Sequence, residues 1–310
     1  MLRIGIDLGG TKTEGIVMDA AGNILQRLRR PTPQSLGYDA ILNNVCSLVA
    51  DLEQRVQGVC RVGIGAPGAI SAGTGLMKNS NTVCLNGRPV LSDLEKMLAR
   101  PLRLANDANC FALSEALDGA GRAQPVVFGV ILGTGVGGGI VVNGRVLPGL
   151  QHIAGEWGHN VLEPLGPPCY CGRHGCVETL LSGPGLARDY THHGGDPNVA
   201  VPDIVARATG GDAIAEAALQ RYFARFGRAL ATVINILDPH AVVLGGGLSN
   251  ILRLYTEGVD QIRRHVFNDA LRTPILRNQH GDSSGVRGAA QLWEAGDELR
   301  RFLAGCRGPQ

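Results

Sequence analysis

An imidazole and three thiols stand close together in the middle of the sequence, at His159, Cys169, Cys171 and Cys176. One histidine with three cysteines is a known ligand set for a tetrahedral zinc ion. Gly172 and Gly175 permit tight turns that can aim the sulfurs at one centre. Scattered structural thiols are the alternative, but the density of these cysteines predicts a structural Zn²⁺. The ion would fix the loop 159–176, which is too rich in Pro, Gly and Cys to form regular structure.

Three glycine-rich turns each follow an apolar run that is typical of a buried strand. They are Gly9-Gly10-Thr11-Lys12, Gly133-Thr134-Gly135-Val136-Gly137-Gly138-Gly139 and Gly245-Gly246-Gly247. Without Cβ atoms, such turns let backbone N–H groups approach phosphate oxygens closely. None fits the Walker pattern, and the second turn does not open a helix as the dinucleotide fingerprint requires. A single turn of this kind is more often a plain hairpin, but three of them after strands predict a bound nucleotide.

Two aspartates lie at or near the ends of predicted strands. Asp7 precedes the first glycine turn, and a carboxylate in an apolar strand is costly to bury without a partner. It either caps its own turn or binds Mg²⁺ on the nucleotide phosphates, directly or through water, and we expect the second. Asn106 and Asp107 follow another strand, where open α/β sheets bind ligands. Asp107 can serve as a helix cap, but beside the glycine turns it is predicted to be the base that accepts a hydroxyl proton in phosphoryl transfer.

Two glutamates flank the cysteine cluster, Glu156 on one side and Glu178 on the other. Either can be a solvated surface residue. If the zinc loop holds them in place, both carboxylates can accept hydrogen bonds from neighbouring sugar hydroxyls. We therefore expect Glu156 and Glu178 to contact a sugar.

Hydrophobic periodicity supplies the elements that must position these residues. We expect strands over 3–8, 13–18, 62–65, 102–105 and 241–244, and helices over 39–57, 107–117, 212–237 and about 286–304. The run 129–133 repeats the pattern of 5–9, which indicates two related domains unless the match is chance among glycines. The predicted class is α/β, with a small domain over 1–118 to which the last helix returns, and a large domain over 119–285 that contains the zinc loop.

The bulk composition narrows the class of protein. A length of 310 residues favours two domains, and a net charge of +2 gives no field that would favour nucleic acid. No apolar run reaches the roughly 20 residues that span a bilayer. Met1 leads directly into the first strand without a leader, so we expect a cytoplasmic protein whose cysteines are thiols or metal ligands.

These motifs, in this order, resemble the ROK family of sugar kinases. The resemblance runs from Ile4 to about Trp293 and rests on the strings at 7–12, 106–109, 132–139, 155–159 and 169–178. It implies an actin-like and hexokinase-like (ribonuclease H-like) fold, with a cleft between two domains for the sugar and for ATP with Mg²⁺ on the glycine turns. It implies that the sugar is held by Asn106, Asp107, Glu156, His159, Glu178, Gly68 and Asn79. His159 would then bind zinc through one ring nitrogen and the sugar through the other.

Within the family, the strings at 235–239, 245–250 and 280–288 look most similar to the fructokinase (manno-fructokinase) type. This resemblance implies transfer of the γ-phosphate to the 6-hydroxyl of D-fructose, with N-acetylglucosamine, glucose or mannose as alternative substrates. A sugar-responsive repressor would need a helix-turn-helix ahead of the sugar domain. Because the first strand begins at residue 3, we do not expect a repressor. Asp7 and Asp107 argue against a catalytically silent sugar sensor. Because members of the family commonly dimerise, a homodimer is expected.

Overall fold

The computed structural model describes residues 1–293, and they fall into two compact units. The first unit consists of Met1–Ser114, Gly144–Ala154 and the described residues from Ser283 onward; the second consists of Glu115–Asn143 and Gly155–Asp282. The sequence predicts a change of domain after residue 118, with 144–154 in the large domain. The structure instead groups 144–154 with the first unit, and helix α3 (Asp107–Leu117) crosses from one unit into the other.

The first unit is built on a sheet with the strand order β3-β2-β1-β4-β7. These strands are β1 (Arg3–Leu8), β2 (Lys12–Met18), β3 (Ile24–Pro31), β4 (Arg61–Ala66) and β7 (Leu102–Asn106). β1 and β2 form an antiparallel hairpin, while β4 and β7 extend the sheet parallel to β1. This unit also contains the short strands β5 (Ala69–Ile70), β6 (Met77–Lys78) and β10 (Arg145–Val146), helix α2 (Val90–Leu98) and the two helices described next.

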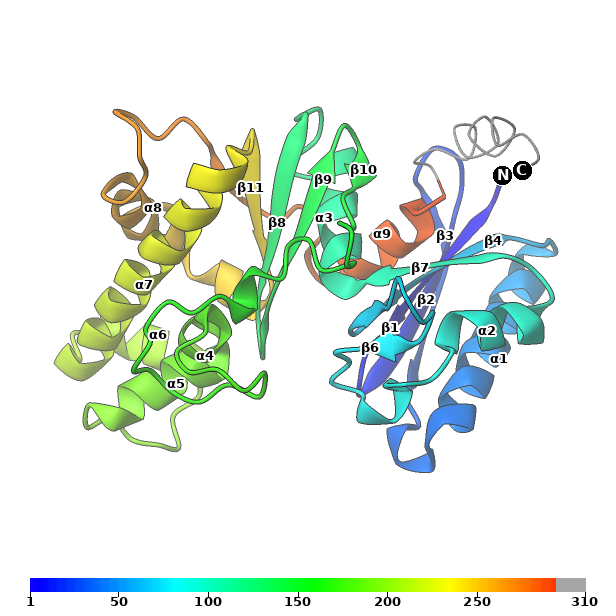
Figure 1. The fold of residues 1–310 in the computed structure, drawn as a ribbon, viewed down its shortest axis with the longest axis horizontal. Coiled ribbons are helices and arrows are strands. Elements are labelled where there is room, and N and C mark those ends of the chain that lie inside the picture. Colours follow the sequence, from blue (N-terminus) through cyan, green and yellow to red (C-terminus); the bar gives the residue numbers. More distant parts are fainter. Residues whose placement is uncertain (294–310) are drawn as a thin grey trace. The chain divides into compact units, whose positions relative to one another are not determined.

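Helices α1 (Tyr38–Val56) and α9 (Ser284–Gln291) cover opposite faces of this sheet (Figure 1). The predicted apolar stripe of α1 is buried against the β1 side chains that point to its face. On the other face, glycines let the α9 backbone approach very closely: a Cβ at Gly63 would lie 1.9 Å from the carbonyl oxygen of Ala289. The predicted last helix is therefore present and packs on the first unit, but it ends at Gln291. The remainder of that prediction, over 294–304, lies outside the described residues.

The second unit is built on a sheet in which β8 (Val126–Leu132) lies between β9 (Val136–Val142) and β11 (Ala241–Gly245). β8 and β9 form an antiparallel hairpin, β11 runs parallel to β8, and β12 (Ile275–Arg277) runs parallel to β11. This is the same local order as β2, β1 and β4 in the first unit. The repeat expected from the sequence is therefore present in the topology of the two sheets.

Helices pack on the second sheet, and the longest of them in the described chain is α7 (Ala213–Leu237). Asp212 caps its first turn by accepting hydrogen bonds from the backbone N–H groups of Ile214 and Ala215. Its aromatic residues Tyr222, Phe223 and Phe226 are fully buried in the core. The neighbouring helices are α4 (Val177–Leu181), α5 (Gly183–His192), α6 (Val201–Thr209) and α8 (Glu257–Arg263). Within residues 1–293, no helix combines the length and the apolar character needed to cross a membrane.

Candidate functional site

The predicted metal ligands lie together in the second unit. The ligand atoms of His159, Cys169, Cys171 and Cys176 are all within 4.8 Å of one another. His159 Nδ1 is 3.6 Å from Cys169 Sγ, and Cys171 Sγ is 3.6 Å from Cys176 Sγ. A tetrahedron with metal–sulfur bonds of about 2.3 Å has edges of about 3.8 Å, so these separations match a tetrahedral zinc site. The donor set and its spacing fit Zn²⁺.

The backbone of the loop is shaped to bring these ligands together. Cys169 and Arg173 are joined by a backbone hydrogen bond of 2.8 Å, and Val161 forms a bridge to Cys176 across the loop. Gly172 and Gly175 both have positive φ angles, 87° and 64°. Both residues therefore have left-handed backbone, which glycine adopts without steric cost.

His159 uses its two ring nitrogens for different partners. Nδ1 faces Cys169, while Nε2 lies 2.9 Å from the hydroxyl oxygen of Tyr170. The two rings pack edge to face with centroids 5.1 Å apart. Tyr170 was not among the predicted site residues, although its position between two ligand cysteines was a usable signal. In this structure it takes the nitrogen that the resemblance assigned to the sugar.

Glu178 is joined directly to the second glycine turn. It lies in the first turn of α4, two residues after Cys176, and its Oε2 accepts a hydrogen bond of 3.0 Å from the backbone N–H of Val136. A Cβ at Gly135 would lie 2.6 Å from the same oxygen, so a larger residue there would displace the Glu178 carboxylate. The structure thus places a predicted sugar ligand against a predicted nucleotide turn within one unit.

Glu156 is held by its neighbour Trp157, which is buried. The indole Nε1 donates to the carbonyl oxygen of Gly137 at 3.2 Å, and the ring packs edge to face on Phe128. This contact fixes the segment carrying Glu156 and His159 against the start of β9. The third glycine turn also meets this end of β8, because a Cβ at Gly246 would lie 2.4 Å from the carbonyl oxygen of Leu132. Two of the three predicted nucleotide turns therefore lie next to each other.

The predicted base is in the first unit, at the junction of β7 and α3. Asp107 is the first residue of α3 and is exposed. Its Oδ1 and the Oδ1 of Asn106 each accept a hydrogen bond of 2.8 Å from the backbone N–H of Ala108. Asn106, which directly precedes the helix, therefore occupies the N-cap position, and Asp107 does not cap the helix itself. Desolvation by surrounding protein raises the pKa of Asp107 above 3.8, although these hydrogen bonds oppose the rise.

Gly68 lies against both Asn106 and the segment that carries Asn79. The side-chain Nδ2 of Asn106 donates to the carbonyl oxygen of Gly68 at 3.3 Å. Gly68 has a φ of 87°, and a Cβ there would lie 2.5 Å from the carbonyl oxygen of Lys78. Asn79 also has a positive φ, 58°. The structure brings these three predicted sugar contacts together.

Asp7 is the predicted magnesium ligand, and its electrostatics fit that role. Burial raises its pKa to about 6, with further increases from the charges of Asp107 and Glu14 and a decrease from Lys12. A divalent cation would relieve the repulsion between Asp7 and Asp107. Glu14 is balanced separately by ion pairs to arginines of β3.

The first glycine turn joins β1 to β2 as a tight hairpin. Gly9 donates its backbone N–H to the carbonyl oxygen of Lys12 at 3.0 Å, and Thr32 donates its hydroxyl to the carbonyl oxygen of Gly9 at 2.6 Å. Thr11 and Lys12 are exposed at the tip. This geometry fits both a plain hairpin and a turn that binds a nucleotide. The contact of the turn with a nucleotide therefore stays a prediction.

Known proteins resemble this chain over nearly its whole length. A family model described as the ROK family matches residues 3–296. N-acetyl-D-glucosamine kinase of Escherichia coli (strain K12) is 42% identical over 298 residues, which are 93% of this chain and 98% of that protein. The solved structure of the ROK hexokinase from Thermus thermophilus is similar with a TM-score of 0.85 and 32% identity, over 94% of this chain and 97% of that one. A ROK family glucokinase from Streptomyces griseus, in complex with glucose and AMPPNP, has a TM-score of 0.79 and 28% identity, over 96% and 100% of the two chains.

Proposed function

The chain belongs to the ROK family, with the actin-like and hexokinase-like fold of its sugar kinases, and from that premise we propose that it transfers the γ-phosphate of ATP to the 6-hydroxyl of N-acetyl-D-glucosamine. The sugar kinase reaction follows from the family and from relatives over nearly the whole chain. The choice of N-acetylglucosamine rests on the relatives at 42% identity. The fructose specificity expected from the sequence has no specific support among these relatives. Glucose is the second candidate, because the hexokinase and glucokinase structures are also similar.

We propose that Asp107 is the general base. Its carboxylate takes the proton of the sugar hydroxyl as the hydroxyl oxygen attacks the γ-phosphorus, the bond to the β-phosphate oxygen breaks, and ADP leaves. The single observation that carries this role is the position of an exposed carboxylate at the carboxyl end of β7, with one oxygen held by the helix and a raised pKa. A higher pKa makes the carboxylate a stronger proton acceptor near neutral pH.

The remaining binding roles are also proposals. Asn106, Gly68 and Asn79 of the first unit, and Glu156 and Glu178 of the second, would bind sugar hydroxyls. His159 would join them once a sugar hydroxyl replaces the Tyr170 hydroxyl at its Nε2. Residues of the three glycine turns would contact the ATP phosphates, and Asp7 would hold the Mg²⁺ that offsets phosphate charge during transfer. The contact between Glu178 and Val136 supports shared placement of sugar and nucleotide residues in the second unit.

We propose that the four-ligand cluster holds a structural Zn²⁺. A set of four protein ligands leaves no open position for a water molecule, so the ion would stabilise the loop and take no part in the chemistry. Its support is the spacing of the ligand atoms and the left-handed glycines between them. The metal would keep His159 and the start of α4 fixed, and α4 carries Glu178.

A coupled assay of ADP formation with a panel of sugars tests this proposal. We expect the highest kcat/KM with N-acetylglucosamine, a lower value with glucose and mannose, and the lowest with fructose. Identification of the product by ³¹P NMR should show a 6-phosphate. Fructose as the best substrate would overturn the choice of sugar, and no ADP formation with any hexose would overturn the kinase proposal.

A further inference from the structure

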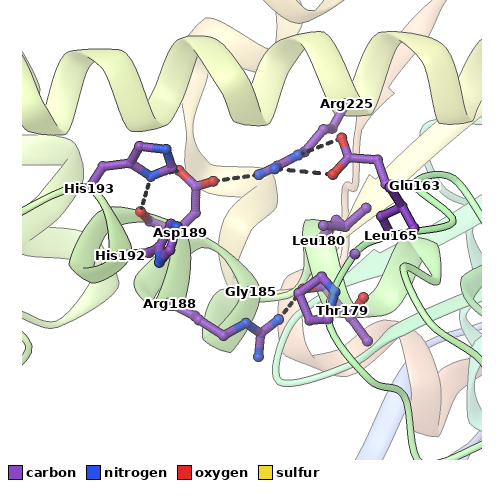
Figure 2. Close-up of a pocket in the computed structure, with 12 residues that line it drawn as sticks. Glu163, Leu165, Thr179, Leu180, Gly185, Arg188, Asp189, His192, His193 and Arg225 are labelled. Atoms are coloured by element: carbon purple, nitrogen blue, oxygen red, sulfur yellow. Dashed lines mark hydrogen bonds and ion pairs between the residues drawn. The ribbon is translucent and has the colours of Figure 1, made fainter.

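Away from the proposed ligand contacts, the second unit has a cavity of about 460 Å³ beside the zinc loop (Figure 2). One wall is the segment 163–167 of that loop, another is α5, and Arg225 reaches into it from α7. Arg188 and Asp189 of α5 also line the cavity. The cavity is thus the place where the loop, α5 and α7 meet.

Arg225 binds two carboxylates from different segments at once. Its Nε and Nη2 donate to the two oxygens of Glu163 at 3.0 and 3.2 Å, and its Nη1 donates to Asp189 at 2.6 Å. The side chain of Arg225 is only 18% exposed, and that of Asp189 is 8% exposed. Partial burial would raise the pKa of each carboxyl, but the arginine hydrogen bonds and charges outweigh it and lower both pKa values. Both carboxylates are therefore stabilised in the charged form.

Glu163 connects this ion-pair network to the metal ligands. The backbone N–H groups of Leu162 and Glu163 both donate to the carbonyl oxygen of Gly175, at 2.8 and 3.1 Å. Gly175 directly precedes the ligand Cys176, and Glu178 follows two residues later. A shift of Glu163 would therefore move Gly175 and the start of α4.

Asp189 secures the other side of the same segment. It lies in α5, which follows α4 after a single residue, Ser182. Arg221 also donates from its Nε to Asp189, at 2.8 Å, and Arg228 donates to Glu163 at 2.7 Å. Arg225 is the residue that joins the two carboxylates, and its planar fork suits that role better than the point charge of a lysine.

We propose that Arg225 is a positioning residue for the sugar site, acting through Glu163 and Asp189 to fix the zinc loop and α4 independently of the metal. The inference rests on the proposed function, because Glu178 is the group that it would place against the sugar. Arg225 itself lies beyond the proposed ligands and takes no part in phosphoryl transfer. Its effect should therefore fall on sugar binding more than on binding of ATP.

Kinetics of Arg225→Met and Arg225→Lys test this proposal, with Arg253→Met as the matched control. Arg253 also joins two carboxylates, Glu216 and Glu257, and starts from the same unit, but neither partner belongs to the zinc loop or to α5. We expect Arg225→Met to raise KM for N-acetylglucosamine about 3- to 30-fold, which lies within the range for loss of a coupled network, with little change in KM for ATP. Arg225→Lys should show a smaller rise, and Arg253→Met should leave both KM values unchanged.

Hydrogen exchange followed by mass spectrometry gives a readout that does not depend on activity. In Arg225→Met, the peptide containing Leu162 and Glu163 should exchange faster than in the wild type or in Arg253→Met, while bound zinc stays at one ion per chain. Equal KM values in Arg225→Met and Arg253→Met, or unchanged exchange of this peptide, would overturn the proposal. If Arg225→Met does not fold, the same comparison with Arg225→Lys decides it. A wild-type protein without kinase activity would refute the proposed function, and the exchange experiment would still test the network.

Discussion

The two glycines between the ligand cysteines should respond very differently to alanine. Gly175 has a φ of 64°, and a Cβ there would lie 1.5 Å from the carbonyl oxygen of Glu163. Gly172 has a φ of 87°, and a Cβ there would meet no atom within 4 Å. Both substitutions impose left-handed backbone on alanine, which costs about 1–2 kcal/mol. Only Gly175→Ala adds a backbone clash, which costs a further 1–3 kcal/mol or so by the usual penalty for overpacking.

We therefore expect Gly172→Ala to lower the free energy of unfolding of the second unit by about 1–2 kcal/mol, and Gly175→Ala by about 2–5 kcal/mol. The fluorescence of Trp157 reports on unfolding of this unit, because its ring is buried there and lies just before His159 in the sequence. The sequence has two tryptophans, so a Trp293→Phe background leaves the fluorescence of Trp157 alone. Urea unfolding followed by this signal measures the difference. Equal losses in the two variants would refute the steric reasoning.

Three further outcomes are expected. The pKa of Asp107 is raised, and a base must be deprotonated to act, so log kcat/KM should fall with decreasing pH along a limb that lies above pH 3.8. A pH–rate profile with this limb at or below pH 3.8 would contradict the prediction. Glu115 is fully buried and accepts backbone hydrogen bonds from Ala120, Gln279 and His280 at 2.9, 3.0 and 3.2 Å. Glu115→Gln should cost about 1–3 kcal/mol in urea unfolding, since an amide nitrogen cannot accept them, and an unchanged midpoint would count against it. Cys171→Ser should reduce zinc below one ion per chain in elemental analysis and raise KM for the sugar; full zinc content in the variant would exclude Cys171 as a ligand.

The elements with strong hydrophobic periodicity could be predicted from the sequence. The helix expected over 39–57 is α1 at Tyr38–Val56, and the helix over 212–237 is α7 at Ala213–Leu237. Strand β3 was missed because half of its residues are polar or charged and its burial alternates along an exposed edge. It is held by tertiary contacts, among them the ion pair of Arg29 with Glu14. Such contacts lie beyond what local periodicity reports.

Some features of the candidate site could likewise be predicted from the sequence, and others could not. The clustering of His159, Cys169, Cys171 and Cys176 could be predicted because these residues are close in sequence and their side-chain chemistry is specific. The bond between Glu178 and Val136, and the fork of Arg225, join residues that are far apart in sequence. No spacing rule connects them, since each depends on how α4 and α7 pack on the sheet. Arg225 also lies on a helix whose apolar face dominates its pattern, so its role was not visible before the structure.

The turnover number of Asp107→Asn at saturating N-acetylglucosamine and ATP tests most directly whether Asp107 is the general base. The variant should stay folded, because replacing a carboxylate with a raised pKa removes a group that is costly to ionise at neutral pH. We expect kcat to fall by a factor of about 10²–10⁴, the usual contribution of a general base, while the sugar still binds. A kcat within a few-fold of the wild type would contradict the central claim that Asp107 accepts the proton of the sugar hydroxyl.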